Sequence, residues 1–165
     1  MITLKNILVA TDFTEASANA LAFGRELARA FGGSLHVLHV VGNIVAEASH
    51  VEGYTTDFAA LQRQAEEAGR KQLDAVVTEE DRRTLAARTI VLTSSTPAEA
   101  IVSYARDAHI SLVIVGTHGR GAVAHLFMGS VAERVVRAAP CPVLTVRATA
   151  IESPSAEAGP AAAHA

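Results

Sequence analysis

Five short apolar segments recur along the chain and alternate with longer segments that have helical periodicity. The apolar segments span residues 7–10, 35–41, 89–92, 112–115 and 143–146. They are rich in β-branched residues, and most lack an alternating polar position, which is typical of strands buried on both faces. The pattern therefore predicts five strands of one parallel sheet.

The first two intervening segments predict long amphipathic helices. The first helix is expected over about residues 14–31 and ends at Gly32 and Gly33, while the second covers about residues 56–77. The connection over residues 42–55 is expected to be an irregular loop, which is longer than most connections. The apolar stripes are predicted to comprise Ala20, Phe23, Leu27 and Phe31 in the first helix, and Phe58, Leu61, Ala65, Ala68, Leu73 and Val76 in the second.

The last two helices carry sequence signals for their first residues. Thr96 and Glu99 have the spacing of a capping box, Pro97 fits the first helical position, and this helix is expected to run to about Ala108. Residues 130–133, Ser-Val-Ala-Glu, form a second predicted capping box for a helix that ends before Pro140.

Strict alternation of strands and helices predicts an α/β fold. We expect a single flavodoxin-like, Rossmann-like, doubly wound domain over residues 1–147. Its five-stranded parallel sheet should have the order 3-2-1-4-5, with helices on both faces. Residues 148–165 are rich in Ala, Ser and Pro and are predicted to be a disordered tail. In such sheets ligands bind beyond the carboxyl ends of the strands, where the strand order reverses.

Composition narrows the classes of partner. The net charge is −3, which gives no reason to expect general nucleic-acid or anionic-membrane binding. Residues 113–147 nevertheless contain four arginines and one acidic residue, which suits either an anionic ligand or an ordinary helix surface. The single cysteine, Cys141, excludes an internal disulfide and fits a cytoplasmic location, and no apolar segment approaches membrane-spanning length.

A glycine-rich segment after the fourth strand is the strongest candidate for ligand binding. It reads Gly116-Thr117-His118-Gly119-Arg120-Gly121 and is followed by Gly129-Ser130 at the start of a helix. Backbone amides in such a loop, the amino end of the helix and the guanidinium group of Arg120 all suit phosphate oxygens. The alternative is a glycine-rich turn followed by an ordinary helix cap at Ser130, and the residues alone leave both open.

Other nucleotide and metal sites lack their sequence patterns. The chain has neither a P-loop nor a dinucleotide fingerprint after the first strand. The turn after that strand lacks the glycine expected for a flavin phosphate, and the acidic pair and lysine of a receiver domain are missing as well. His36 and His39 are three residues apart on a strand, so they should point to opposite faces and not share a metal ion. We therefore expect no protein-bound metal.

The glycine pattern also carries a family resemblance. Gly116-x2-Gly119-x9-Gly129-Ser130 resembles the nucleotide-binding signature of the universal stress protein family. Residues 7–14, 38–41 and 140–146 are similar to that family's first, second and last strands, so the resemblance covers residues 3–147. It implies that this chain binds ATP, with Mg²⁺ carried by the nucleotide.

The resemblance implies a role for each site residue. Asp12 would bond the ribose hydroxyls with Thr11 beside it, and the backbone of Val40 would meet the adenine edge. The remaining residues would surround the phosphates, namely Gly116, His118, Gly119, Arg120, Gly121, Gly129, Ser130 and Val131. The position of Asp12 also suits a ribose contact better than a catalytic role, and the alternative is that Asp12 is the amino-terminal cap of the first helix.

Three functions follow from these features. The favoured hypothesis is an ATP-binding regulatory module of the stress response that is recognised by an unknown protein partner. It would pair as a homodimer through Val143–Val146. The second is a slow ATPase or phosphoryl-transfer enzyme with His118 as general base. The third is a dimeric interaction protein whose loop holds no ligand.

Overall fold

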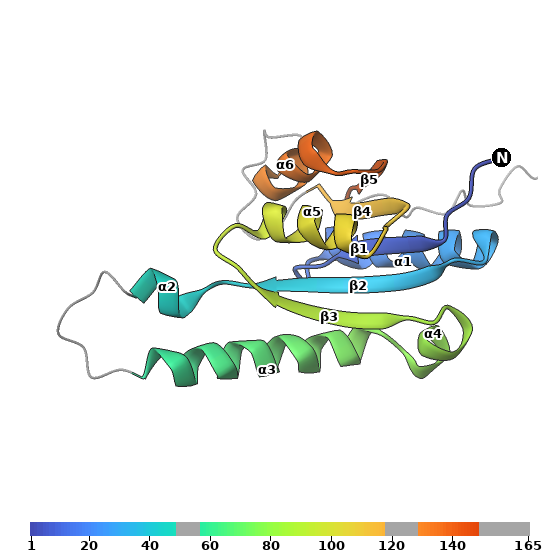
Figure 1. Cartoon of the computed structure of the whole chain (residues 1–165). Coiled ribbons are helices and arrows are strands. Elements are labelled where there is room, and N and C mark those ends of the chain that lie inside the picture. Colours follow the sequence, from blue (N-terminus) through green and yellow to red (C-terminus); the bar gives the residue numbers. More distant parts are fainter. Residues whose placement is uncertain (49–56, 118–128, 149–165) are drawn as a thin grey trace, which may run out of the picture.

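The computed structural model describes residues 1–48, 57–117 and 129–148, and its centre is a five-stranded parallel sheet (Figure 1). The strands are β1 (Asn6–Ala10), β2 (Ser34–Val41), β3 (Arg88–Thr93), β4 (Leu112–Gly116) and β5 (Val143–Val146). Their order is β3-β2-β1-β4-β5, and every neighbouring pair is parallel, so the predicted fold class and strand order are confirmed. The order reverses between β1 and β4, which is the switch point of the sheet.

Helices cover both faces of the sheet and enclose two apolar layers. Helices α1 (Glu15–Phe31) and α3 (Phe58–Val76) lie on one face, and α5 (Pro97–Asp107) and α6 (Ser130–Ala138) lie on the other (Figure 1). Alternate strand residues point into the two layers. Ile7, Val9, Leu35, Val37 and Ile114 pack toward α1 and α3, while Leu8, Leu38, Val113 and Val115 pack toward α5 and α6.

The predicted apolar stripes of the two long helices are confirmed only in part: Ala20 and Leu73 are buried, and Leu27 and Val76 pack against the core, but the large residues Phe23, Phe31 and Leu61 are exposed. Helix α1 packs through Ala16, Ala20, Gly24 and Ala28, whereas Phe23 and Phe31 are 39% and 45% exposed. A Cβ atom on Gly24 would lie 2.5 Å from Val9 Cγ2, so this helix approaches β1 too closely for a larger residue. Helix α3 likewise buries Gln62, Gly69 and Leu73 and leaves Leu61 exposed. Close packing on the sheet selects small residues over the large ones that periodicity favours.

Two short helices lie within segments for which the sequence predicts no helix. Helix α2 (Ile44–Ala48) occupies part of the predicted loop over residues 42–55, and residues 49–56 of that loop lie outside the described residues. The buried Gln62 side chain accepts a hydrogen bond from the Ile44 amide at 2.8 Å, which fixes the start of α2 against α3. Helix α4 (Glu79–Thr84) begins with a capping box formed by Thr78 and Asp81.

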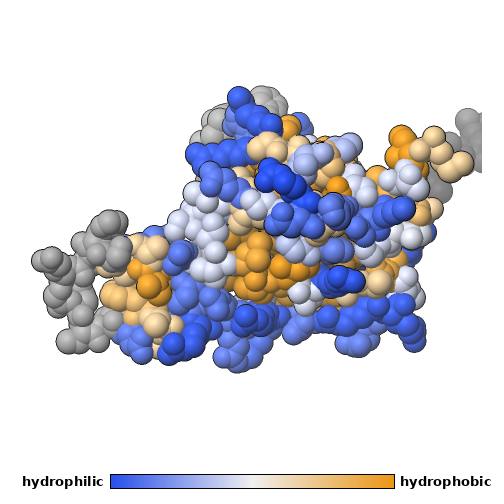
Figure 2. Space-filling model, viewed as in Figure 1, coloured by the Kyte–Doolittle hydropathy of each residue, from blue (hydrophilic) through white to orange (hydrophobic). Residues whose placement is uncertain are grey.

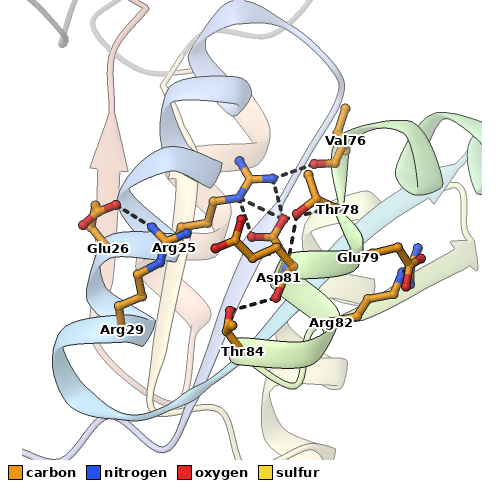
Figure 3. Close-up of polar contacts among 10 residues, drawn as sticks. Arg25, Glu26, Arg29, Val76, Thr78, Glu79, Asp81, Arg82 and Thr84 are labelled. Atoms are coloured by element: carbon orange, nitrogen blue, oxygen red, sulfur yellow. Dashed lines mark hydrogen bonds and ion pairs between the residues drawn. The ribbon is translucent and has the colours of Figure 1, made fainter.

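A buried ion pair joins α1 to α4 (Figure 3). The Arg25 guanidinium donates to both carboxylate oxygens of Asp81, at 2.8–3.0 Å, and to the Val76 carbonyl at 2.6 Å. The Asp81 side chain is 2% exposed and also accepts the Thr78 amide at 2.9 Å. This cluster holds the end of α3 and the whole of α4 against the middle of α1.

The predicted capping box at the start of α5 does not form. The Thr96 hydroxyl donates to the Glu99 carboxylate at 3.1 Å and caps no backbone amide, while Pro97 does occupy the start of the helix as predicted. The Thr96 amide is itself bound by the Ser94 hydroxyl at 3.0 Å. The start of α5 is thus fixed by the turn before it, through a hydroxyl that the capping pattern does not include.

Apolar surface gathers at two places on the face seen in Figure 2. One lies over α2 and the start of α3, where Val45 and Leu61 are exposed. The other lies between α5 and α3 in the view of Figure 2, over the edge strand β3, in which Ile90 and Leu92 are half-buried. None of the described helices is long and apolar enough to cross a membrane.

Candidate functional site

The segments predicted to bind a ligand meet at the switch point of the sheet. Ala10 is the register partner of both Leu38 and Val115, so Thr11 and Asp12 leave β1 between the ends of β2 and β4. Gly116 ends β4 on one side, and Val40 lies near the end of β2 on the other. This edge is where doubly wound sheets bind ligands.

The turn after β1 is held in an unusual conformation around Asp12. Asp12 Oδ1 accepts hydrogen bonds from the Thr14 amide at 3.1 Å and the Thr14 hydroxyl at 2.5 Å. Phe13 between them has φ +63°, a left-handed conformation that is costly for an aromatic residue. Thr14, not Asp12, is the N-cap residue of α1. Within the described part of the chain Asp12 Oδ2 has no partner, so one carboxylate oxygen is left to bind a ligand.

The hydroxyl of Thr11 belongs to the framework of this turn. It accepts the Phe13 amide at 3.0 Å and donates to the Ser17 hydroxyl at 3.0 Å, and Ser17 in turn donates to the Thr14 carbonyl at 2.9 Å. Thr11 and Ser17 are both buried. Thr11 therefore lies beside Asp12 as predicted, but its side chain supports the turn and does not face solvent.

The backbone of Val40 faces the gap beyond the end of β1. Peptide groups alternate sides along a strand: the Leu38 carbonyl accepts the Thr11 amide, and the Val41 carbonyl accepts the Ser94 amide after β3, each at 2.9 Å. The backbone amide and carbonyl of Val40, two residues beyond Leu38, therefore point toward the β1 side, where β1 has already ended. This is the position at which an adenine edge was predicted.

Gly116 has a structural role that the glycine pattern did not reveal. A Cβ atom on Gly116 would lie 2.9 Å from three atoms of α1, namely the carbonyl carbon and Cβ of Ala16 and the amide nitrogen of Ser17. The missing side chain thus allows the first turn of α1 to rest on the end of β4. This contact, unlike contact with phosphates, is visible in the fold itself.

Helix α6 begins at the same edge, one residue earlier than predicted. Gly129 is the N-cap residue and Ser130 the first helical residue, so the expected Ser130 capping box is wrong. The Gly129 amide donates to the Thr117 carbonyl at 2.5 Å, which ties the helix to the end of β4. Gly129 has no side chain to cap this helix, Ser130 and Val131 are exposed, and no side chain of the described residues accepts a hydrogen bond from the first amides of α6. Such an end favours an anion.

Four predicted phosphate residues, His118, Gly119, Arg120 and Gly121, lie outside the described residues, and their roles stay predictions. Of the other arginines in the positively charged segment, Arg137 forms an exposed ion pair with Glu133 at 2.8 Å. That arginine belongs to the helix surface.

The two strand histidines point to opposite faces of the sheet, as predicted. His36 lies under α5, where its Nδ1 is 2.8 Å from the Tyr104 hydroxyl. His39 lies on the other face, where its Nδ1 is 2.8 Å from the Thr11 carbonyl and its ring contacts that of Phe13 at a centroid distance of 4.5 Å, tilted by 46°. The contact of His39 with the turn could not be predicted from the sequence, in which His39 is notable only as a possible metal ligand, because no local pattern indicates that a strand side chain will reach the next turn.

His36 gives the fold a dependence on pH. Burial, and secondarily the charge of Arg88, lower the pKa of His36 below its ordinary 6.5. The unfolded chain therefore takes up a proton first, and stability falls as the pH drops from 6.5 toward the folded-state pKa, by up to about 1.4 kcal/mol per pH unit. We expect urea denaturation to show a smaller loss of stability between pH 7 and pH 5 for His36→Asn, whose side-chain amide lies near the position of Nδ1 and can keep the bond to Tyr104. Equal slopes for the two proteins would contradict this assignment.

Comparisons with known proteins agree with this fold. The sequence model of the universal stress protein family matches residues 3–147. A universal stress protein of Thermus aquaticus is 36% identical in an alignment of 150 positions that covers 87% of this chain and 98% of that protein. The crystal structure of a family protein from Burkholderia pseudomallei is 30% identical, covers 87% of this chain and 96% of its own, and has a TM-score of 0.67. A universal stress protein from Archaeoglobus fulgidus in complex with dAMP shares the fold at 23% identity, with 88% of this chain and 99% of its own covered and a TM-score of 0.57.

Proposed function

Because this chain belongs to the universal stress protein family, we propose that it binds ATP at the switch point and acts as a nucleotide-dependent regulatory module. One observation carries the proposal: the open carboxylate oxygen of Asp12 and the uncapped amino end of α6 lie at the same edge of the sheet. A hydroxyl-binding acceptor and an anion-binding helix end are the two features that a nucleoside phosphate requires.

Each part of the nucleotide has a matching group on the chain. Asp12 accepts hydrogen bonds from the ribose hydroxyls, and the Val40 peptide pairs with the adenine edge. The amides of Ser130 and Val131 bind the phosphates, and Gly129, whose own amide is bound to the Thr117 carbonyl, begins the helix that presents them. His118, Gly119, Arg120 and Gly121 complete the phosphate site in this proposal, and Mg²⁺ arrives with the nucleotide and supplies charge neutralisation. Gly116 contributes indirectly, since it lets α1 and the Asp12 turn lie against β4.

The Archaeoglobus fulgidus structure with dAMP is an example of a protein of this fold that binds a nucleotide. At that level of identity the likeness concerns the fold alone, so the support for ATP comes from this chain's own residues. An uncapped helix end beyond the ribose position favours a ligand with phosphates over a free nucleoside.

We also propose that two copies pair through β5 in the cytoplasm. β5 forms one edge of the sheet and carries Val143, Leu144 and Val146. An apolar edge strand requires cover against uncontrolled pairing, and a second copy provides it. Sedimentation of the wild type against Leu144→Lys tests this part separately from nucleotide binding.

Thermal unfolding tests ATP binding directly. Ligand at a hundred times its dissociation constant stabilises a fold by about 2.7 kcal/mol, which for a domain of this size raises the Tm by roughly 5–10 °C. We expect this shift with Mg-ATP and not with Mg-GTP, after extraction of any nucleotide retained from the host. Absence of a shift at millimolar ATP, with no nucleotide released by extraction, would overturn the proposal.

Asp12→Asn is the matched variant for that experiment. Asparagine keeps an acceptor for the Thr14 amide and so preserves the turn, but replaces the open carboxylate oxygen with a donor. The variant is expected to melt near the wild type without ligand and to lose most of the ATP-induced shift. An unchanged shift would remove Asp12 from the ligand site.

A further inference from the structure

The β1–β2 hydrogen-bond ladder stops one step early, because side chains replace its next two bonds. In a parallel ladder that continued past Ala10, the Val40 amide would donate to the Thr11 carbonyl, and the Phe13 amide would donate to the Val40 carbonyl. Instead the Thr11 carbonyl faces His39 Nδ1 at 2.8 Å, and the Phe13 amide donates to the Thr11 hydroxyl at 3.0 Å. Among the described residues the Val40 amide has no backbone partner on that side.

His39 is fixed in place from both sides of its ring. Its partner is a carbonyl oxygen, which can only accept, so Nδ1 carries the proton. The ring contacts that of Phe13 in a tilted arrangement, at a centroid distance of 4.5 Å. On the other side Gly69 of α3 leaves room for it, since a Cβ atom there would lie 3.1 Å from His39 Cδ2. The imidazole thus fills a slot between the strained turn and α3.

We propose that His39 is a positioning residue of the nucleotide site: it ends the β1–β2 ladder and thereby keeps the Val40 peptide available for the base. By holding the Thr11 carbonyl and the Phe13 ring, it also fixes the turn that presents Asp12. This inference rests on the proposed ATP site, although its structural part can be measured without nucleotide.

The hydrogen-bonding pattern of the base can be used to measure whether the Val40 peptide is free. Adenine presents an acceptor at N1 and a donor at its 6-amino group, which match the amide and carbonyl of Val40. Hypoxanthine, in ITP, presents the reverse pattern at the same two positions and differs from adenine nowhere else. Preference for ATP over ITP therefore reports whether the Val40 peptide is free to pair.

Two variants separate the hydrogen bond from the volume of the ring. His39→Leu removes the donor, so the Thr11 carbonyl becomes available to the Val40 amide. His39→Asn places an amide nitrogen near the position of Nδ1 and can keep the bond. We expect His39→Leu to lower the preference for ATP over ITP by about tenfold, in calorimetric titrations, and His39→Asn to restore most of it. A purely structural role would lower the Tm of ligand-free protein and leave this ratio unchanged.

Amide hydrogen exchange of ligand-free protein tests the ladder itself. The Val40 amide is expected to exchange freely in the wild type and about tenfold more slowly in His39→Leu, where it pairs with Thr11. Unchanged exchange together with an unchanged ATP/ITP ratio overturns the inference. If the wild type binds neither nucleotide, the proposed function fails and with it the positioning role for a nucleotide, whereas slowed exchange in His39→Leu would still establish that His39 ends the ladder.

Discussion

Asp81→Ala is expected to destabilise the fold by about 3–5 kcal/mol and to lower the Tm by roughly 6–20 °C. The substitution removes the partner of a guanidinium group whose side chain is only 22% exposed, and it leaves the Thr78 amide without its acceptor (Figure 3). Arg25 would retain the Val76 carbonyl as its acceptor, without a negative charge nearby. Urea denaturation of the two proteins at pH 7 measures the difference.

Asp74→Ala is the matched control, because it deletes the same side chain from an exposed ion pair. Asp74 and Arg82 are 2.7 Å apart, but their side chains are 61% and 30% exposed. Solvent screening limits such a pair to at most about 1 kcal/mol. If both substitutions cost the same small amount, the Arg25–Asp81 pair does not hold α4 against α1.

Acid titration gives a second view of the same pair. Burial alone would raise the pKa of Asp81, but the hydrogen bonds from Arg25 and Thr78 outweigh burial and hold that pKa below 3.8. The stability contributed by this carboxylate is therefore complete above about pH 4 and is lost as the pH falls through its folded-state value. Asp81→Ala should lack this part of the acid transition.

The sheet could be predicted from sequence because its signals are local and repeated. Each strand is a continuous apolar segment, and parallel strands buried on both faces leave no other arrangement for such segments. The helix faces could not be predicted in the same way. Periodicity places Phe23 and Phe31 on a stripe, but the distance between α1 and the sheet is set by Gly24 and its alanine neighbours. That distance is a property of the packed pair and not of either segment alone.

The site shows the same division between local and long-range information. The positions of Asp12, Val40 and Gly129 at one edge follow from the strand order, which the sequence predicted. The replacement of ladder hydrogen bonds around Thr11 does not follow from the strand order. It depends on a histidine 28 residues away and on Gly69 in another helix. Likewise Gly116 belongs to a recognisable pattern, while its contact with Ala16 appears only once α1 is folded onto β4.

Gly116→Ala is expected to destabilise the fold by about 1–3 kcal/mol, because overpacking costs this much where neighbours cannot move aside. The new methyl group would meet backbone atoms of Ala16 and Ser17 at 2.9 Å, and backbone in the first turn of a helix yields less easily than the end of a flexible side chain. Urea denaturation measures the loss. Gly42→Ala, just after β2, is the control: its added Cβ would meet only a Glu47 carboxylate oxygen at 4.0 Å, so its stability should match or exceed that of the wild type.

The same pair of variants distinguishes two roles for the first glycine of the motif. If Gly116 serves packing, Gly116→Ala loses stability, and ATP binding weakens because the displaced start of α1 moves the turn that carries Asp12. If Gly116 instead lines the phosphates directly, the variant loses ATP binding while its free energy of unfolding without ligand stays at the wild-type value. The 2.9 Å contacts favour the first outcome. A glycine in this pattern would then mark a ligand site by placing the neighbouring helix and not by touching the ligand.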